Sequence, residues 1–179
     1  TDIIGDTIWK WKPGTGNQVV MRPSHKANGM TLDQEGRLVV AGWASRTVWR
    51  MELDGSVKTL CSHFNGKKIN TPNDIVVKSD GSVWFTDPPF GLMAFYEGEK
   101  KQPEQPHTNV YRVDGQSGAI TRVCNDVDHP NGLAFSPDES ILYVIESRSE
   151  PRNILAYDVG ADGKTLRNRR VFYACKPGE

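Results

Sequence analysis

The sequence predicts an all-β protein made of repeated four-stranded units, the organisation of a β-propeller. Two hairpin patterns alternate along the chain, and the first of them recurs at roughly regular intervals. A period of about 40 to 50 residues with four strands in each unit is typical of propeller blades. No stretch shows the three-and-four spacing of apolar residues that an amphipathic helix requires. An all-β sandwich is the alternative, and a fixed repeat argues against it.

The first hairpin pattern begins with an asparagine. A short alternating strand follows, then a turn rich in Asp and Gly, then a second strand rich in aromatic and β-branched residues. The pattern starts at Asn28, Asn73 and Asn131, that is, after about 45 and then about 58 residues. Two of these asparagines precede Gly29 and Gly132, and an Asn-Gly pair is ordinary turn chemistry in which Gly supplies a positive φ.

The second hairpin pattern starts at residues 7–11, 47–51, 109–113 and 153–157, and each start is followed by a Gly/Asp turn and another apolar strand. Tryptophans 9, 49 and 84 fall on strand positions and are expected to pack between blades. The longer second interval contains residues 91–107, which are charged, contain prolines and lack alternation. This segment is predicted to be an inserted loop and a candidate lid, with Phe95 and Tyr96 as a sugar-stacking face.

Together these patterns predict that residues 1–179 form a single, partial propeller domain of roughly three and a half to four blades. Propellers usually close with four to eight blades, and an unclosed one would present raw sheet edges. The chain is therefore expected to be part of a longer protein. A cytoplasmic and a periplasmic location are both compatible with the sequence.

The charge balance excludes some partners. The chain has 22 basic and 22 acidic residues and a formal net charge of zero, without a block of Lys or Arg. Neither nucleic acid nor a membrane surface is an expected partner, because both attract basic proteins. No apolar run approaches the ~20 residues that cross a bilayer.

The three repeated asparagines are the candidate site residues. The first strand of each blade lines the central channel of a propeller, so Asn28, Asn73 and Asn131 are expected to converge. Amide oxygens are hard, neutral ligands suited to calcium, which takes six to eight oxygens. The four histidines show no zinc-ligand spacing. The alternative is that each Asn is a turn residue whose side chain bonds the backbone nearby.

Three stretches resemble one known family. INTPNDIVVKSDGSVWFTDPPFG (69–91) and HPNGLAFSPDESILYVIES (129–147) are similar to the gluconolactonase family, also called the regucalcin or senescence marker protein family. NGMTLDQEGRLVVAG (28–42) fits an earlier blade of that family. The resemblance extends over nearly the whole chain. It implies a six-bladed propeller with one divalent ion in its channel, usually calcium, with zinc, magnesium and manganese as alternatives.

The resemblance also implies roles for two asparagines. Asn131, in the PNG motif, is implied to be a metal ligand, and Asn73, in the PND motif, a second ligand or a holder of substrate and water. The family's Glu ligand and its general-base Asp are expected before Thr1 and beyond Glu179. No catalytic residue is therefore assigned within the chain.

The carboxylates nearest to the motifs do not occupy those two positions. Asp87, in FTDPPFG, is a candidate substrate-binding residue near the channel, and a turn-capping role is the alternative. Asp74 is expected to be structural, since period-2 alternation turns it away from its neighbour Asn73. Glu146 is the third of these nearest carboxylates.

The function implied is a calcium-dependent hydrolase, a lactonase, that opens a sugar lactone such as gluconolactone by attack of water. One alternative keeps the ion and changes the substrate, as in paraoxonase-like and diisopropyl fluorophosphatase-like propellers. Another is a non-catalytic propeller that binds calcium or a protein partner.

Overall fold

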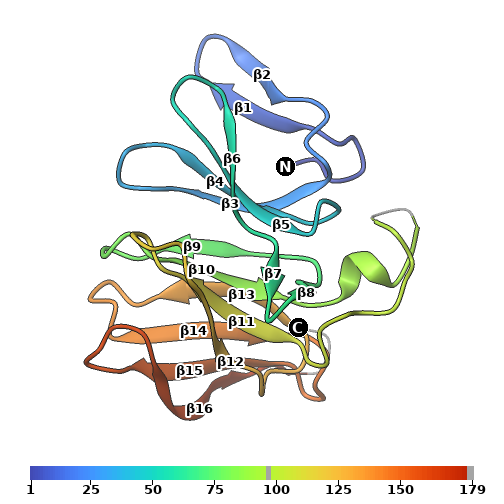
Figure 1. Cartoon of the computed structure of the whole chain (residues 1–179). Helices are drawn as coiled ribbons and strands as arrows, with labels where there is room; N and C mark the ends of the chain where they lie inside the picture. Colours follow the sequence, from blue (N-terminus) through green and yellow to red (C-terminus); the bar gives the residue numbers. More distant parts are fainter. Residues whose placement is uncertain (96–97, 177–179) are drawn as a thin grey trace.

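The computed structural model describes residues 1–95 and 98–176. Its main elements are three four-stranded antiparallel sheets, each formed by consecutive strands, which confirms the predicted all-β fold of four-stranded units. Figure 1 shows the sheets following one another in chain order, with β1–β2 at one end of the molecule and β13–β16 at the other.

Each sheet combines one hairpin of each predicted pattern. The first contains β3 (Ala27–Leu32), β4 (Leu38–Gly42), β5 (Thr47–Met51) and β6 (Val57–Cys61). The second contains β9 (Ile75–Val77), β10 (Val83–Asp87), β11 (Asn109–Val113) and β12 (Ile120–Cys124). The third contains β13 (Pro130–Phe135), β14 (Ile141–Glu146), β15 (Asn153–Val159) and β16 (Leu166–Ala174).

Shorter elements precede and connect these sheets. A two-stranded sheet is formed by β1 (Ile8–Lys12) and β2 (Gly16–Met21), and a small hairpin by β7 (His63–Phe64) and β8 (Lys67–Lys68). A single turn of 3₁₀ helix, η1 (Phe90–Leu92), follows β10. Within the described ranges there is no helix of the length and apolarity needed to span a bilayer.

The hydrophobic cores lie between consecutive sheets, and the middle strands of the second sheet, β10 and β11, bury both of their faces. In β10, Phe85 packs into a cluster with Val39 and Val48 of the first sheet. Its neighbour Trp84 points the other way, into a cluster with Leu142 and Leu155 of the third sheet. Successive side chains of a strand face opposite sides, so a run such as VWFTD serves two interfaces at once.

The predicted packing of the tryptophans holds for two of the three. Trp84 is fully buried and Trp49 is 4% exposed. Trp9 is 43% exposed, so the prediction was wrong for this residue. It lies on β1, whose sheet has only two strands, and no described sheet covers that face of β1.

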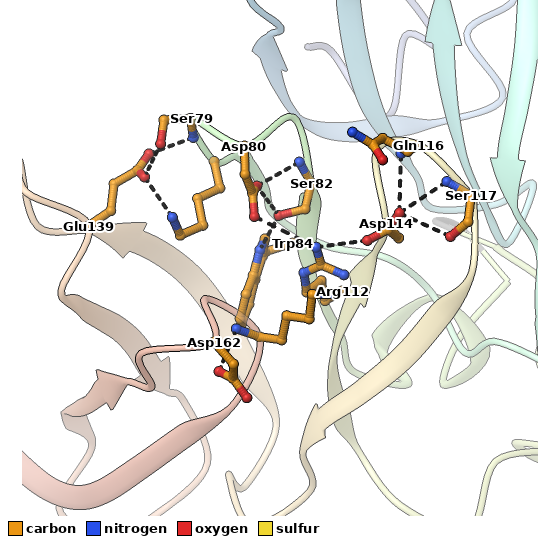
Figure 2. A network of polar contacts seen from close by, with 12 residues as sticks. Ser79, Asp80, Ser82, Trp84, Arg112, Asp114, Gln116, Ser117, Glu139 and Asp162 are labelled. Atoms are coloured by element: carbon orange, nitrogen blue, oxygen red, sulfur yellow. Dashed lines mark hydrogen bonds and ion pairs between the residues drawn. The ribbon is translucent and has the colours of Figure 1, made fainter.

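A polar network ties the sheets together at the ends that carry the β3–β4, β9–β10 and β13–β14 turns. Figure 2 shows Glu139 reaching Ser79, whose backbone N–H it accepts at 2.7 Å, and Glu139 also pairs with Lys78 at 2.8 Å. Arg112, 4% exposed, bonds Asp114 at 3.0 Å in the same region. These contacts hold the turns, while the asparagines open strands at the opposite end.

Candidate functional site

The three candidate asparagines lie at the same end of adjacent inner strands. Asn28 is in β3, Asn131 is in β13, and Asn73 stands two residues before β9. The backbone N–H of Gly29 donates to the carbonyl of Asn73 at 2.8 Å. The hydroxyl of Thr86 donates to the carbonyl of Asn131, and the carbonyl of Thr86 in turn accepts the N–H of Asn73. The fold therefore brings the three positions together across three sheets.

The carboxamides of these asparagines are left available. Asn73 is only 6% exposed, yet none of the three side-chain amides forms a hydrogen bond with another residue in 1–95 or 98–176. A turn-forming Asn would instead bond nearby backbone. The amide atoms of Asn73 keep some exposure to solvent, because they are not among the fully buried side-chain atoms that lack a partner. This arrangement suits the binding of a ligand.

Asp74 connects the inner strands instead of facing the channel end. Its Oδ2 accepts the backbone N–H of Leu133 at 3.0 Å, and its own N–H donates to Thr86 Oγ1 at 3.1 Å. The carboxylate thus bridges the second and third sheets directly behind the asparagines.

The glycines after Asn28 and Asn131 serve close packing, which corrects the expectation of a positive φ. Neither Gly29 nor Gly132 has a positive φ. A Cβ on Gly29 would lie 2.7 Å from the carbonyl oxygen of Asn73 and 2.6 Å from Asp74 Oδ1. The inner strands approach one another so closely here that only glycine fits.

Asp87 lies behind the segment that carries Asn73. It is fully buried, and its Oδ2 accepts the backbone N–H of Asn70 at 2.8 Å. Burial raises the pKa of Asp87 to about 8, although the Asn70 N–H and the charge of Arg46 act in the opposite direction. Direct contact between Asp87 and substrate stays a prediction, because the carboxyl group faces protein here.

This raised pKa gives a pH dependence to stability. The unfolded pKa of an Asp is about 3.9, so the stabilising contribution is complete below that value and is lost as pH rises through about 8. We expect Asp87→Asn, which does not titrate, to gain stability relative to the parent between pH 5 and pH 9. Urea unfolding of both proteins at pH 5 and pH 9 measures this gain. If the difference in free energy of unfolding between the two proteins were the same at both pH values, the prediction would be contradicted.

Aromatic and basic side chains next to the first and third sheets surround Phe90 of η1 at this end. Trp43 stacks on Phe90 with ring centroids 6.1 Å apart, and His129 stacks at 5.5 Å. The guanidinium of Arg148 lies 5.7 Å from the centre of the Phe90 ring. Since His129 is two residues before Asn131, this cluster stands beside the asparagines.

The segment predicted to be a loop at 91–107 borders an open pocket of about 600 Å³, whose lining includes Leu92, Phe95, Lys100 and His129. Phe95 is 75% exposed, and Tyr96 lies outside the described residues. The far end of the segment is anchored, because Gln105 Nε2 donates to the carbonyls of Phe64 and Lys67.

Comparison with known proteins decides the family. The SMP-30/Gluconolactonase/LRE-like region matches residues 1–179. The chain belongs to the SMP-30/gluconolactonase/LRE-like family. It is 31% identical over 192 residues to a gluconolactonase of Zymomonas mobilis, covering 97% of this chain and 53% of that protein.

Solved structures agree with this assignment. The family member described here matches a gluconolactonase from Xanthomonas campestris with a TM-score of 0.91 and 36% identity, over 98% of this chain and 58% of the other. A putative gluconolactonase gives a TM-score of 0.88 at 30% identity, over 100% and 60%. The chain therefore spans a little over half the length of these relatives.

The candidate oxygen donors of this family member are carboxamides. Among the described residues no group of three or more His, Cys, Asp or Glu side chains could hold a metal. Sequence reasoning did not single out Arg46, Asn70, Phe90 or His129 as functional residues, although the last three fall inside the quoted motifs. Arg46 carries no local signal, because its side-chain contacts lie more than twenty residues away in the chain.

Proposed function

We propose that this chain belongs to a calcium-dependent lactonase that opens a sugar lactone, such as gluconolactone, by attack of water. The observation that supports the proposal is a pair of carboxamides, Asn73 and Asn131, at one end of adjacent inner strands in a member of this family. Neither carboxamide has a hydrogen-bond partner among the residues that the structure describes. Relatives bear the names gluconolactonase and lactonohydrolase.

The donor chemistry fits a hard cation. Asn131 and Asn73 would each offer a neutral amide oxygen, which calcium accepts readily and which needs no deprotonation. Calcium supplies a Lewis acid for the lactone carbonyl when it is bound. Two amides are fewer than the six to eight oxygens that calcium takes, so carboxylates and water would complete the site.

The chain's own residues would orient the lactone. The pocket next to His129 has the size expected for a small metabolite, since ligand pockets span roughly 300 to 1,000 Å³. The imidazole of His129 lines this pocket and offers a flat surface against which a sugar ring can lie. Asn73 would hold substrate or the attacking water by its carboxamide. We assign no general base within residues 1–179.

A substrate panel tests the proposal. We expect the full-length protein with added calcium to hydrolyse gluconolactone and related sugar lactones, and to lose this activity in a chelator. Aryl esters and fluorophosphates are the comparison substrates, and a preference for either would overturn the sugar-lactone assignment in favour of another hydrolase. Calcium binding without turnover of any substrate would favour a non-catalytic propeller.

A further inference from the structure

The segments that lead into the two site asparagines are held by the same arrangement of contacts. In the second sheet, Asn70 lies three residues before Asn73, and its backbone N–H donates to Asp87 Oδ2 at 2.8 Å. In the third sheet, Asp128 lies three residues before Asn131, and its backbone N–H donates to Glu146 Oε1 at 3.1 Å. Each acceptor is the last residue of the second strand of its sheet, β10 or β14.

The match extends to the neighbours of the two carboxylates. Asp87 pairs across the sheet with Asn109, the first residue of β11, and Glu146 pairs with Asn153, the first residue of β15. Both carboxylates are shielded from water, with exposures of 0% for Asp87 and 6% for Glu146. A buried acid that repeats in register from one sheet to the next is a built feature of this end of the fold.

An arginine accompanies each carboxylate. Arg46, 5% exposed, donates from Nε to the carbonyls of Ile69 at 2.9 Å and Asn70 at 3.0 Å, and its charge acts on Asp87. In the third sheet, Arg169 Nη2 lies 3.3 Å from Glu146 Oε1. The segments before Asn73 and Asn131 are therefore held by hydrogen bonds to acidic side chains that are shielded from water, where such bonds are strong.

We propose that Asp87 and Glu146 are positioning residues. Asp87 accepts the backbone N–H of Asn70 and thereby sets the placement of Asn73. Glu146 accepts the backbone N–H of Asp128 and thereby sets the placement of Asn131. The proposal rests on the proposed function and assigns Asp87 a role other than direct substrate contact. Removing Asp87 would leave a buried N–H unsatisfied, and removing Glu146 a partly buried one, at a cost of up to about 1–3 kcal/mol. The segment would then shift to recover a partner. Displacement of a ligand-holding group by about 1 Å is enough to reduce turnover strongly.

A crossed set of substitutions tests the proposal. Asp87→Ala and Glu146→Ala remove the acceptors, whereas Asp87→Asn and Glu146→Gln keep an oxygen that can accept the same N–H. Leu155→Ala, in the buried core of the third sheet, serves as the control for lost stability alone. Calcium affinity, kcat and KM are measured for all five variants.

We expect each alanine variant to bind calcium about 10- to 100-fold more weakly, the usual effect of removing a group that orients a ligand. The Asn and Gln variants should stay within about threefold of the parent in affinity and kcat/KM. The control should melt at a lower temperature with unchanged affinity. Asp87 acting as a charged substrate contact would instead raise KM equally in Asp87→Asn and Asp87→Ala, which would overturn the assignment.

A spectroscopic measurement separates this proposal from the proposed function. In ¹H–¹⁵N spectra, Asp87→Ala should shift the side-chain amide signal of Asn73 but not that of Asn131, and Glu146→Ala should do the reverse. Unmoved amide signals in both variants would refute the positioning role. If the parent neither binds calcium nor hydrolyses lactones but the crossed shifts appear, the proposed function fails and the positioning role stands.

Discussion

Asn131→Ala is expected to abolish lactone hydrolysis and to weaken calcium binding, because it removes an oxygen donor while leaving the backbone in place. The contact between Thr86 and Asn131 uses the Asn131 carbonyl, so alanine preserves it. Loss of a group that merely orients a ligand costs about 10- to 100-fold, so loss of a donor should lower kcat/KM by more than about 100-fold. Steady-state kinetics and calcium titration calorimetry measure both effects.

The matched control is Asn125→Ala, which makes the same chemical change at an exposed position after β12. We expect this control to keep the parent's calcium affinity, turnover and melting temperature. If Asn131→Ala retained full turnover, Asn131 would not be a metal ligand, and the function proposed above would lose its main support.

Gly29→Ala is expected to lower the free energy of unfolding by about 3 kcal/mol, at the upper end of the usual range for overpacking. The new Cβ would lie 2.7 Å from both the carbonyl oxygen of Asn73 and the Cα of Asp74. These are backbone atoms of the neighbouring sheet, so relief requires the inner strands to move apart. Because that movement would carry Asn73 with it, catalytic activity should fall as well. Urea unfolding and gluconolactone turnover are the two measurements.

Gly132→Ala is the control for this prediction, since it makes the same change at the equivalent position of the third sheet. Its Cβ would meet the Cδ1 atom of Ile145 at 2.9 Å, and Ile145 is 42% exposed and free to turn away. We expect Gly132→Ala to lower the free energy of unfolding by less than about 1 kcal/mol. Equal losses of unfolding free energy for the two variants would show that the close approach of β3 to Asn73 is not what makes Gly29→Ala destabilising.

Much of the fold could be predicted because its signals are local. Alternation within a strand and the Gly/Asp turns between strands depend on neighbouring residues, so both hairpin patterns were found at the correct places. The same reasoning placed Asp74 on the side of its strand opposite Asn73, and the structure uses that carboxylate to hold Leu133. Trp9 was misjudged because burial depends on whether another sheet covers it, which no local pattern records.

The candidate site was only partly predictable. Repetition along the chain singled out Asn73 and Asn131, but not that their amides have no partner within the described part of the protein. The roles of Arg46 and Glu146 were not foreseen, since each follows from contacts with residues distant in sequence. The glycine of the Asn-Gly pair was assigned to turn geometry. Gly29 is instead required because the backbone of Asn73 and Asp74, leading into the next sheet, leaves no room for a Cβ.

By itself, the sequence determined the strand order, the repeat and which asparagines are the candidate site residues, because each of these depends on residues close together along the chain. Only the tertiary structure decided which end of the sheets the asparagines share, how closely β3 approaches Asn73, and which buried acids hold the segments before Asn73 and Asn131. Those features arise from packing between sheets, where the partners of a residue are set by the stacking of whole blades and not by its neighbours in the chain.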